Sequence, residues 1–424
     1  MDLEGSSNKK IGFFPSFDCL GDTFPFIKIA EKCRAKGAKV LFFSHGGVYE
    51  NLVKKYGFEL IQIEPILKDA KLEDATKTLA SAKQSDEYYI DIIKKEGQAF
   101  VDAEIELLVQ PNVLITTVAS SKYKKIPSVS VMSGVWLPEY FKNHHDTFPD
   151  GSENFFTRLL PHFIKGNLFN WLILNNKGPF VKKYNNIFKK LNITFRFSKG
   201  IDLLLGDKTL VCDDINFLQI NPSKNIPKEN FIGPILSNDL FDDEIDTNEK
   251  ELEDFLKNKK SILITMGSTG NKKIYLKILN ELNNTDYNVL AIYTNILNEE
   301  EIKDYSKNIL FRKFVPDVKS FNEIADLAVI HGGRGTVYTA AYSGKPVIGI
   351  PRDLMEQQYN LDCLVRHNNG FRLSYKYFNE KKFMKSVKTI FNNYDYYHKN
   401  AIKLSKKIQK PNGDIKAARL LLDF

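Results

Sequence analysis

The sequence predicts an α/β protein built from two doubly wound parallel sheets. The chain has 424 residues, which is too long for one ordinary core. Short apolar runs alternate with helix-patterned segments in both halves, as in parallel sheets crossed by helices. An acidic stretch separates the two halves. Hydrophobic residues make up 43% of the chain and aromatic residues 12%, which is typical of a folded protein.

The first half begins with a strand, a loop, a helix and a second strand at short spacing. The helical segment 25–36 ends at Gly37, a residue that commonly follows a helix C-terminus. This order is typical of a βαβ unit. We assign residues 1–236 to an N-terminal domain. Its apolar runs predict buried strands at 11–14, 39–44, 113–117 and 128–132.

An acidic segment at 237–254 predicts an exposed linker, because it carries nine acids against the single base Lys250. Residues 255–424 then form a C-terminal domain, and its last helix is expected to pack back on the N-terminal domain. A parallel sheet here predicts a ligand cleft outside the carboxyl ends of its strands. The predicted strands are 261–265, 289–293, 310–314, 327–330 and 346–350.

Composition argues against several classes of protein. The net charge of +8 is not accompanied by helix-turn-helix or finger spacing, so we expect no nucleic-acid partner. The four cysteines form no CxxC pair, which predicts buried, reduced thiols rather than a zinc site or disulfides. No apolar run of about 18 residues occurs, and the N-terminus does not resemble a signal peptide. We therefore expect a cytoplasmic protein without a spanning helix.

A glycine-dense turn in the second half predicts an anion site. It follows the strand that ends at Ile330, and a helix is expected from about Thr336. Glycine lets backbone N–H groups approach an anion closely, and a helix N-terminus adds partial positive charge. The turn is a candidate diphosphate cradle, although many α/β turns need glycine for steric reasons alone. Its residues are His331, Gly332, Gly333, Arg334 and Gly335.

The segment that contains this turn resembles the donor-binding signature of family 1 glycosyltransferases, the UDP-glycosyltransferase-like group. It is nearest to the antibiotic and sterol branches of that family. The resemblance implies the GT-B fold, in which the sheets of two Rossmann-like domains face each other across a cleft. The matching residues are His331, Gly332, Gly333, Gly335, Thr336, Gly344, Pro346, Pro351, Glu356, Gln357 and Asn360.

The resemblance implies a role for each part of the donor site. The diphosphate would be held by His331, Gly333, Gly335 and Thr336, and also by Gly267, Ser268 and Thr269, which match the turn after the first strand of the donor domain. The base would stack on Phe314 and meet the backbone near Val315, where a plain strand end is the alternative interpretation. Sugar hydroxyls would be bound by Glu356 and Gln357.

A second matching motif lies near the N-terminus, at Gly21, Asp22 and Pro25. In the enzymes that it resembles, the acidic residue at this position takes the proton from the acceptor hydroxyl. An aspartate at a helix start is otherwise more often an N-cap. The motif reverses that preference, so Asp22 is the predicted catalytic base.

The predicted function is inverting transfer of a hexose from a nucleoside diphosphate to a hydroxyl of a small or lipidic acceptor. UDP is the favoured donor nucleotide and dTDP the alternative, because Thr339 stands where many relatives place a ribose-binding glutamate. We expect no metal, and no cofactor other than the donor as co-substrate. The alternatives are a non-catalytic sugar-nucleotide-binding subunit and a sugar-nucleotide epimerase or hydrolase of the same fold.

Residues 155–191 combine closely spaced apolar side chains with lysines. The favoured interpretation is a buried helical hairpin with a solvated basic face. The alternative is a surface that borders the acceptor cleft and makes peripheral contact with a membrane.

Overall fold

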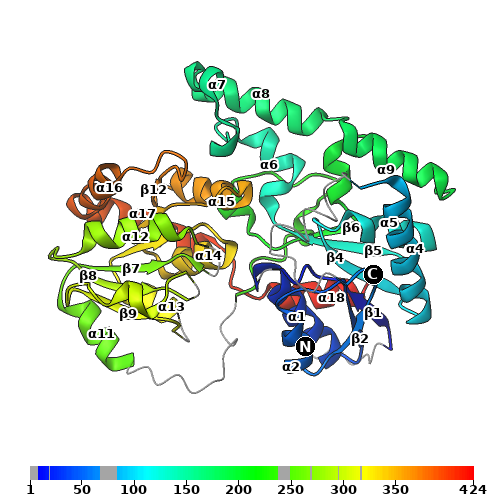
Figure 1. Ribbon diagram of the computed structural model, residues 1–424, viewed down its shortest axis with the longest axis horizontal. Coiled ribbons are helices and arrows are strands. Elements are labelled where there is room, and N and C mark those ends of the chain that lie inside the picture. The colour runs from blue at the N-terminus through cyan, green and yellow to red at the C-terminus, as the bar shows by residue number, and fades with distance from the viewer. Residues whose placement is uncertain are drawn as a thin grey trace.

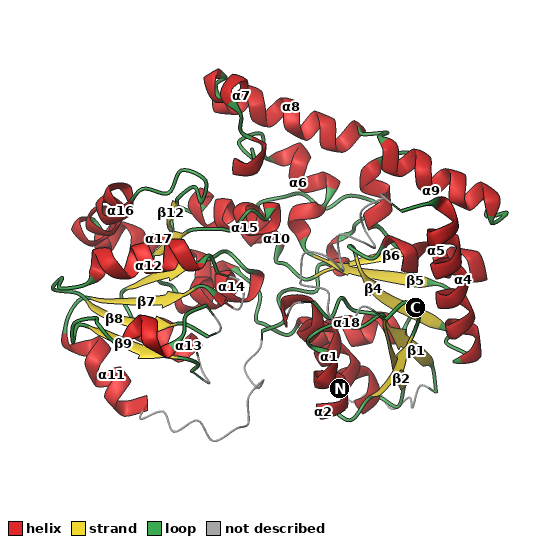
Figure 2. Ribbon diagram, in the orientation of Figure 1, coloured by secondary structure: helices red, strands yellow, loops and turns green. Residues whose placement is uncertain are grey.

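The computed structural model describes residues 8–18, 20–66, 84–236, 249–267, 270–294, 296–315 and 318–424. Its strands form two separate six-stranded sheets, and every strand pair in both is parallel. Figures 1 and 2 show helices against each sheet and the two sheets at opposite ends of the molecule. The predicted fold class of two Rossmann-like domains is confirmed.

The N-terminal sheet has the order β3-β2-β1-β4-β5-β6. Its strands are β1 (Lys10–Phe13), β2 (Lys39–Ser44), β3 (Glu59–Gln62), β4 (Leu107–Pro111), β5 (Ser128–Met132) and β6 (Lys208–Val211). Its helices are α1 (Leu20–Ala35), α2 (Glu50–Lys55), α4 (Asp86–Asp102), α5 (Ile115–Lys124), α6 (Pro138–Asn143), α7 (Phe155–Leu159), α8 (His162–Asn175), α9 (Pro179–Lys190) and α10 (Ile215–Leu218). Short 3-10 turns are η1 (Gly134–Trp136), η2 (Asp150–Ser152), η3 (Gly200–Leu204) and η4 (Lys228–Asn230).

The C-terminal sheet has the order β12-β11-β10-β7-β8-β9. Its strands are β7 (Ser261–Thr265), β8 (Asn288–Ile292), β9 (Ile309–Arg312), β10 (Leu327–Ile330), β11 (Val347–Gly349) and β12 (Gly370–Arg372). Around it lie α11 (Glu249–Asn258), α12 (Lys272–Leu282), η6 (Glu299–Ile302), α13 (Val318–Ile324), α14 (Arg334–Ser343), α15 (Met355–Arg366), α16 (Glu380–Asn392) and α17 (Tyr394–Lys407). The last helix, α18 (Gly413–Leu422), ends the chain.

Helix α18 packs against the N-terminal sheet rather than the C-terminal one (Figure 1). Ala417, Ala418 and Leu421 are fully buried in the same apolar cluster as residues of β1, β2 and α1. The predicted linker at 237–254 is described only from residue 249, where α11 begins, and residues 237–248 lie outside the described ranges.

A buried cluster joins the two halves of the molecule. It combines side chains near β5 and β6, such as Val135 and Phe217, with side chains of α14 and α15, such as Tyr338 and Tyr359. The hydroxyl of Tyr140 donates to the carbonyl oxygen of Tyr359 at 3.2 Å. The two domains are therefore held together in part through aromatic side chains, and the site described below lies beside this contact.

Two predictions about the first half were wrong. Residues 113–117 form no strand: β4 ends at Pro111 and α5 begins at Ile115. The first turns of α5 are buried all round, so a short apolar run there has the pattern of a strand. The buried hairpin is correct for α9, whose Tyr184 and Phe188 are fully buried, but not for α7, which buries no side chain.

Candidate active site

The glycine-dense turn connects β10 to α14 and packs tightly on α15. Gly332 has φ +90°, and a Cβ on it would lie 2.5 Å from the carbonyl oxygen of Gln357. The side-chain amide of Asn360 donates to the carbonyl oxygen of Gly332 at 3.1 Å. Glycine is therefore required at 332 for both backbone and steric reasons. The turn is held in one shape by buried contacts.

The turns after β7 and β10 meet around His331. Ile330 pairs with Thr265 in the parallel register, so the residues that follow these strands leave the sheet side by side. A Cβ on Gly267 would lie 2.5 Å from His331 Cε1, and one on Gly333 would lie 2.6 Å from His331 Nε2. The imidazole therefore fits between two glycines. Three predicted donor residues lie together here.

His331 is 7% exposed, and its environment disfavours a positive charge. Burial, together with the nearby positive charge of Arg352, lowers the pKa of His331 to about 4. The imidazole is thus neutral near pH 7. Its Nδ1 atom is buried, and the backbone of Thr265 beside the ring acts to raise the pKa, against the two stronger effects. A neutral imidazole can donate one hydrogen bond to a ligand oxygen.

The N-terminus of α14 presents backbone rather than side chains. Gly333 is its N-cap residue, and the Thr336 hydroxyl donates to the Gly333 carbonyl oxygen at 2.8 Å. Gly335 is exposed, and a Cβ on it would meet no atom within 4 Å. Because the first N–H groups of a helix have no acceptor within it, this end is suited to an anion.

Asp22 lies in the first turn of α1 and is partly exposed. Pro25, four residues after Gly21, has no N–H group to donate to the Gly21 carbonyl oxygen. That oxygen instead accepts a hydrogen bond from Arg334 Nη2 of the C-terminal domain at 3.4 Å. The proline of the N-terminal motif thus leaves a carbonyl available to the opposite domain.

Arg334 lies among carboxylates from both domains. Burial disfavours its charge, but Cys212, Glu356, Asp213 and Asp22 raise the pKa of the guanidinium above its usual value. The sequence analysis identified Arg334 only as a residue of the glycine-dense turn. In the structure it links the donor turn to the segment that carries Asp22.

Glu356 and Gln357 occupy the first turn of α15 but have different partners. Trp136 Nε1 donates to Glu356 Oε2 at 3.3 Å, across the two domains. Burial and the neighbouring Asp22 charge raise the pKa of Glu356, while Arg334 acts to lower it. Gln357 is buried, and its Oε1 accepts from the Arg352 backbone N–H at 2.8 Å. Only Glu356 is joined to the N-terminal domain.

Two further predicted donor residues, Phe314 and Val315, follow the end of β9. Val315 is fully buried in a cluster with α11 and α13, so its side chain faces the core. Phe314 beside it is partly exposed. Ser268 and Thr269 lie outside the described residues.

Two residues beside the site were not predicted. Asp213 follows β6, and its Oδ2 accepts from the Gly134 N–H at 2.6 Å and from the Ser133 hydroxyl at 3.0 Å. Burial raises the pKa of Asp213. These contacts hold the turn that carries Trp136. Neither Trp136 nor Asp213 belongs to a recognisable motif, so the sequence carried no signal for them.

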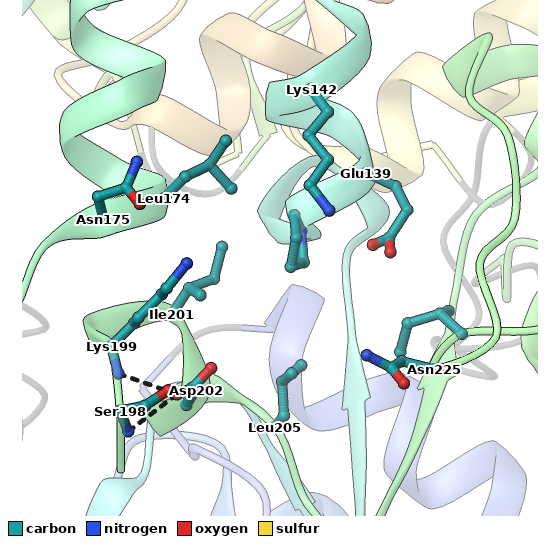
Figure 3. Close-up of a pocket in the computed structure, with 12 residues that line it drawn as sticks. Glu139, Lys142, Leu174, Asn175, Ser198, Lys199, Ile201, Asp202, Leu205 and Asn225 are labelled. Atoms are coloured by element: carbon teal, nitrogen blue, oxygen red, sulfur yellow. Dashed lines mark hydrogen bonds between the residues drawn. The ribbon is translucent and has the colours of Figure 1, made fainter.

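A cavity of about 470 Å³ lies in the N-terminal domain between α6, the end of α8 and η3. Lys142 of α6 and Lys199 before η3 point into it from opposite sides (Figure 3). Pro138, two residues after Trp136, is one of the residues that line this cavity. None of the predicted site residues lines it.

Comparison with known families and sequences connects the chain to glycosyltransferases. Residues 261–414 match the model of the glycosyltransferase family 28 C-terminal domain. A PGL/p-HBAD biosynthesis glycosyltransferase of Mycobacterium tuberculosis is 24% identical over 286 residues, 65% of this chain and 61% of the relative. Mouse (Mus musculus) UDP-glucuronosyltransferase 3A1 is 23% identical over 251 residues, 57% of this chain and 47% of the relative. The chain thus aligns with less than two thirds of the length of either relative.

Solved structures match over nearly the whole chain. The spinosyn forosaminyltransferase SpnP has a TM-score of 0.67 at 15% identity and covers 99% of this chain and 100% of its own. The calicheamicin glycosyltransferase CalG4 has a TM-score of 0.64 at 15% identity, with 97% of each chain covered. VinC, solved in complex with dTDP, has a TM-score of 0.60 at 12% identity, covering 98% of this chain and 99% of its own. The chain therefore has the GT-B fold, and its resemblance to GT-B glycosyltransferases is confirmed.

Proposed function

We propose that the protein is an inverting hexosyltransferase that uses a nucleoside-diphosphate hexose. The observation that carries the proposal is the meeting of two elements across the domain contact. One is the glycine-enclosed His331 with the N-terminus of α14, and the other is the first turn of α1, which carries Asp22. Arg334 connects the two through the Gly21 carbonyl oxygen.

In the proposal, the diphosphate binds at the turns after β7 and β10. A neutral His331 donates to a phosphate oxygen, and the open N–H groups near Gly335 and Thr336 offset the negative charge. Gly267 and Gly333 leave room for this approach, and Ser268 and Thr269 add donors. The base lies on Phe314 beside Val315, and the sugar hydroxyls reach Glu356 and Gln357. UDP is the favoured nucleotide and dTDP the alternative.

The transfer step needs a base for the acceptor hydroxyl. The proton moves from that hydroxyl to Asp22 as the oxygen attacks the anomeric carbon. The bond from that carbon to the phosphate oxygen breaks, and the nucleoside diphosphate leaves with the electron pair. A single displacement inverts the anomeric configuration. The Arg334 guanidinium, whose pKa is raised by Asp22 and Glu356 among others, places a positive charge between the proposed base and the proposed sugar-binding carboxylate.

The proposal further includes independence from metal ions, a cytoplasmic location, and a small or lipidic acceptor with a membrane contact near residues 155–191. It keeps the domain division at 237–254. No helix among the described residues is long and apolar enough to span a membrane.

Product analysis tests the proposal. The protein is incubated with UDP-hexose or dTDP-hexose, with and without a panel of apolar alcohols, phenols and lipids, and products are identified by mass spectrometry. We expect acceptor-dependent release of nucleoside diphosphate with a hexose added to the acceptor, and the same rate in EDTA. Donor binding without any product would favour a non-catalytic subunit, and a new free sugar or epimer would favour the hydrolase or epimerase.

A further inference from the structure

Helices α7 and α8 carry a large set of exposed apolar side chains. Both helices lie along one edge of the molecule, beyond α6 and away from the two sheets (Figure 1). The side chains that are between 50% and 78% exposed are Phe155, Phe156, Leu159, Phe163, Leu168, Trp171 and Leu172. We call these seven residues the apolar edge.

Helix α8 is fixed to the protein by its opposite face. The Asn170 side-chain amide donates to the carbonyl oxygens of Phe141 at 2.9 Å and His144 at 2.6 Å. A Cβ on Gly166 would lie 2.0 Å from the His145 carbonyl oxygen, so the helix approaches this loop as closely as glycine allows. Leu168 and Trp171 point away from these contacts, because they lie on the other side of the helix, and Phe163 is exposed in its first turn. The exposed face is therefore held in place.

The apolar edge is too large to be an ordinary surface. Phe155, Phe156, Phe163 and Trp171 are 60% to 78% exposed. At about 200 Å² for each aromatic side chain, these four expose roughly 500 Å² before the leucines are added. Monomeric proteins rarely leave a patch of this size uncovered unless it is an interaction site.

The positive charge of the segment that contains the apolar edge indicates what kind of partner it meets. Residues 154–201 contain nine Lys or Arg and no Asp or Glu. Lys190 forms ion pairs with Asp86 and Glu87, whereas Lys177, Lys182 and Lys189 are exposed and pair with no carboxylate of the described chain. A two-fold dimer through this edge would bring like charges together. An anionic surface would satisfy them.

The length of α8 limits how it meets such a surface. Its 14 residues span about 21 Å, less than the roughly 30 Å of a bilayer core. Tryptophan and phenylalanine beside lysine are typical of helices that lie in the plane of the interface. We propose that the apolar edge of α7 and α8 docks the protein on the surface of an anionic lipid membrane. This docking specifies the membrane contact included in the proposed function, and it is tested by lipid binding alone, without sugar transfer.

Vesicle co-sedimentation at low salt tests the docking. Vesicles of phosphatidylcholine with one quarter phosphatidylglycerol are compared with pure phosphatidylcholine. We expect at least tenfold tighter binding to the anionic vesicles. The double variant Phe163→Ser/Leu168→Ser should lose at least tenfold of that affinity. Its matched control is Tyr396→Ser/Ile415→Ser, which removes two apolar side chains of similar exposure elsewhere and should bind as the unmodified protein does.

The lysines are tested separately. Lys177→Gln/Lys182→Gln/Lys189→Gln should weaken binding to anionic vesicles severalfold, whereas Lys382→Gln/Lys385→Gln/Lys388→Gln on α16 removes the same charge and should not. Thermal unfolding of each variant establishes that it is folded.

Two results would overturn the proposal. The first is protein that stays in the supernatant with anionic vesicles. The second is a dimer in sedimentation equilibrium that Phe163→Ser/Leu168→Ser dissociates, with equal vesicle binding by all variants, which would make the edge a contact between copies.

Discussion

The candidate site has one side from the C-terminal domain and one from the N-terminal domain, which we call its two walls. The two walls differ in the kind of atoms that form them. On the C-terminal side, backbone and glycine dominate: Gly267 and Gly333 enclose the His331 ring, and Gly332 lies against the backbone of α15. On the N-terminal side, side chains dominate, with Asp22 at the start of α1 and Trp136 reaching Glu356. A Cβ at Gly267, Gly332 or Gly333 would lie within 2.6 Å of another atom, whereas Asp22 is a partly exposed side chain that can be exchanged for one of the same shape. The proposed donor binding and the proposed acceptor activation should therefore be separable by substitution.

The largest expected effect is on the N-terminal wall. Asp22→Asn should lower kcat at least about a hundredfold, because it removes the proton acceptor and keeps the shape of the side chain. Steady-state kinetics with a saturating donor measure it. Asp91→Asn, which alters an exposed carboxylate on α4, is the control and should leave kcat unchanged. Turnover within a fewfold of normal in Asp22→Asn would rule out this base.

A smaller effect is expected on the C-terminal wall. Gly333→Ala should weaken nucleotide-sugar binding by about tenfold or more, because the added methyl would lie 2.6 Å from His331 Nε2 and displace the ring. Gly200→Ala is the control, since its nearest contact would be an ordinary 3.5 Å. Calorimetry compares the two variants. Equal nucleotide-sugar affinities of Gly333→Ala and Gly200→Ala would show that donor binding does not depend on the position of the His331 ring.

The pH dependence of stability sharpens the comparison further. The pKa of His331 is about 4 in the folded protein and about 6.5 when unfolded, so the unfolded chain binds more protons between these values. The free energy of unfolding should fall as pH decreases from 6.5 to 4, by up to about 3 kcal/mol from this residue. Urea unfolding of the wild type and His331→Asn measures it. The free energy of unfolding of His331→Asn should decrease less steeply than that of the wild type as pH falls. The same pH dependence in both proteins would contradict the burial of a neutral imidazole at position 331.

The C-terminal wall was predictable from the sequence because its determinants are local. Gly332, Gly333 and Gly335 directly follow or closely follow His331, and their spacing predicts a strand, a turn and a helix; Gly267 belongs to the separate turn after β7. The wrong strand at 113–117 shows the limit of local patterns, since a buried helix start is as apolar as a strand.

The N-terminal wall was predictable only in part. The pairing of Trp136 with Glu356 joins residues 220 positions apart, and that of Arg334 with Gly21 joins residues 313 apart. Nothing in either local sequence specifies such a partner. The same holds for α7 and α8, whose apolar residues have the composition of a core although α8 is packed on one side only.

One set of titrations tests most directly whether His331 serves donor binding while Asp22 does not. UDP and dTDP are titrated calorimetrically into the wild type, Asp22→Asn and His331→Ala. The account predicts that Asp22→Asn binds the preferred nucleotide with the wild-type Kd, and that His331→Ala binds it about tenfold more weakly through the loss of a hydrogen bond to a charged oxygen. Wild-type affinity in His331→Ala, or an equal loss in both variants, would contradict it.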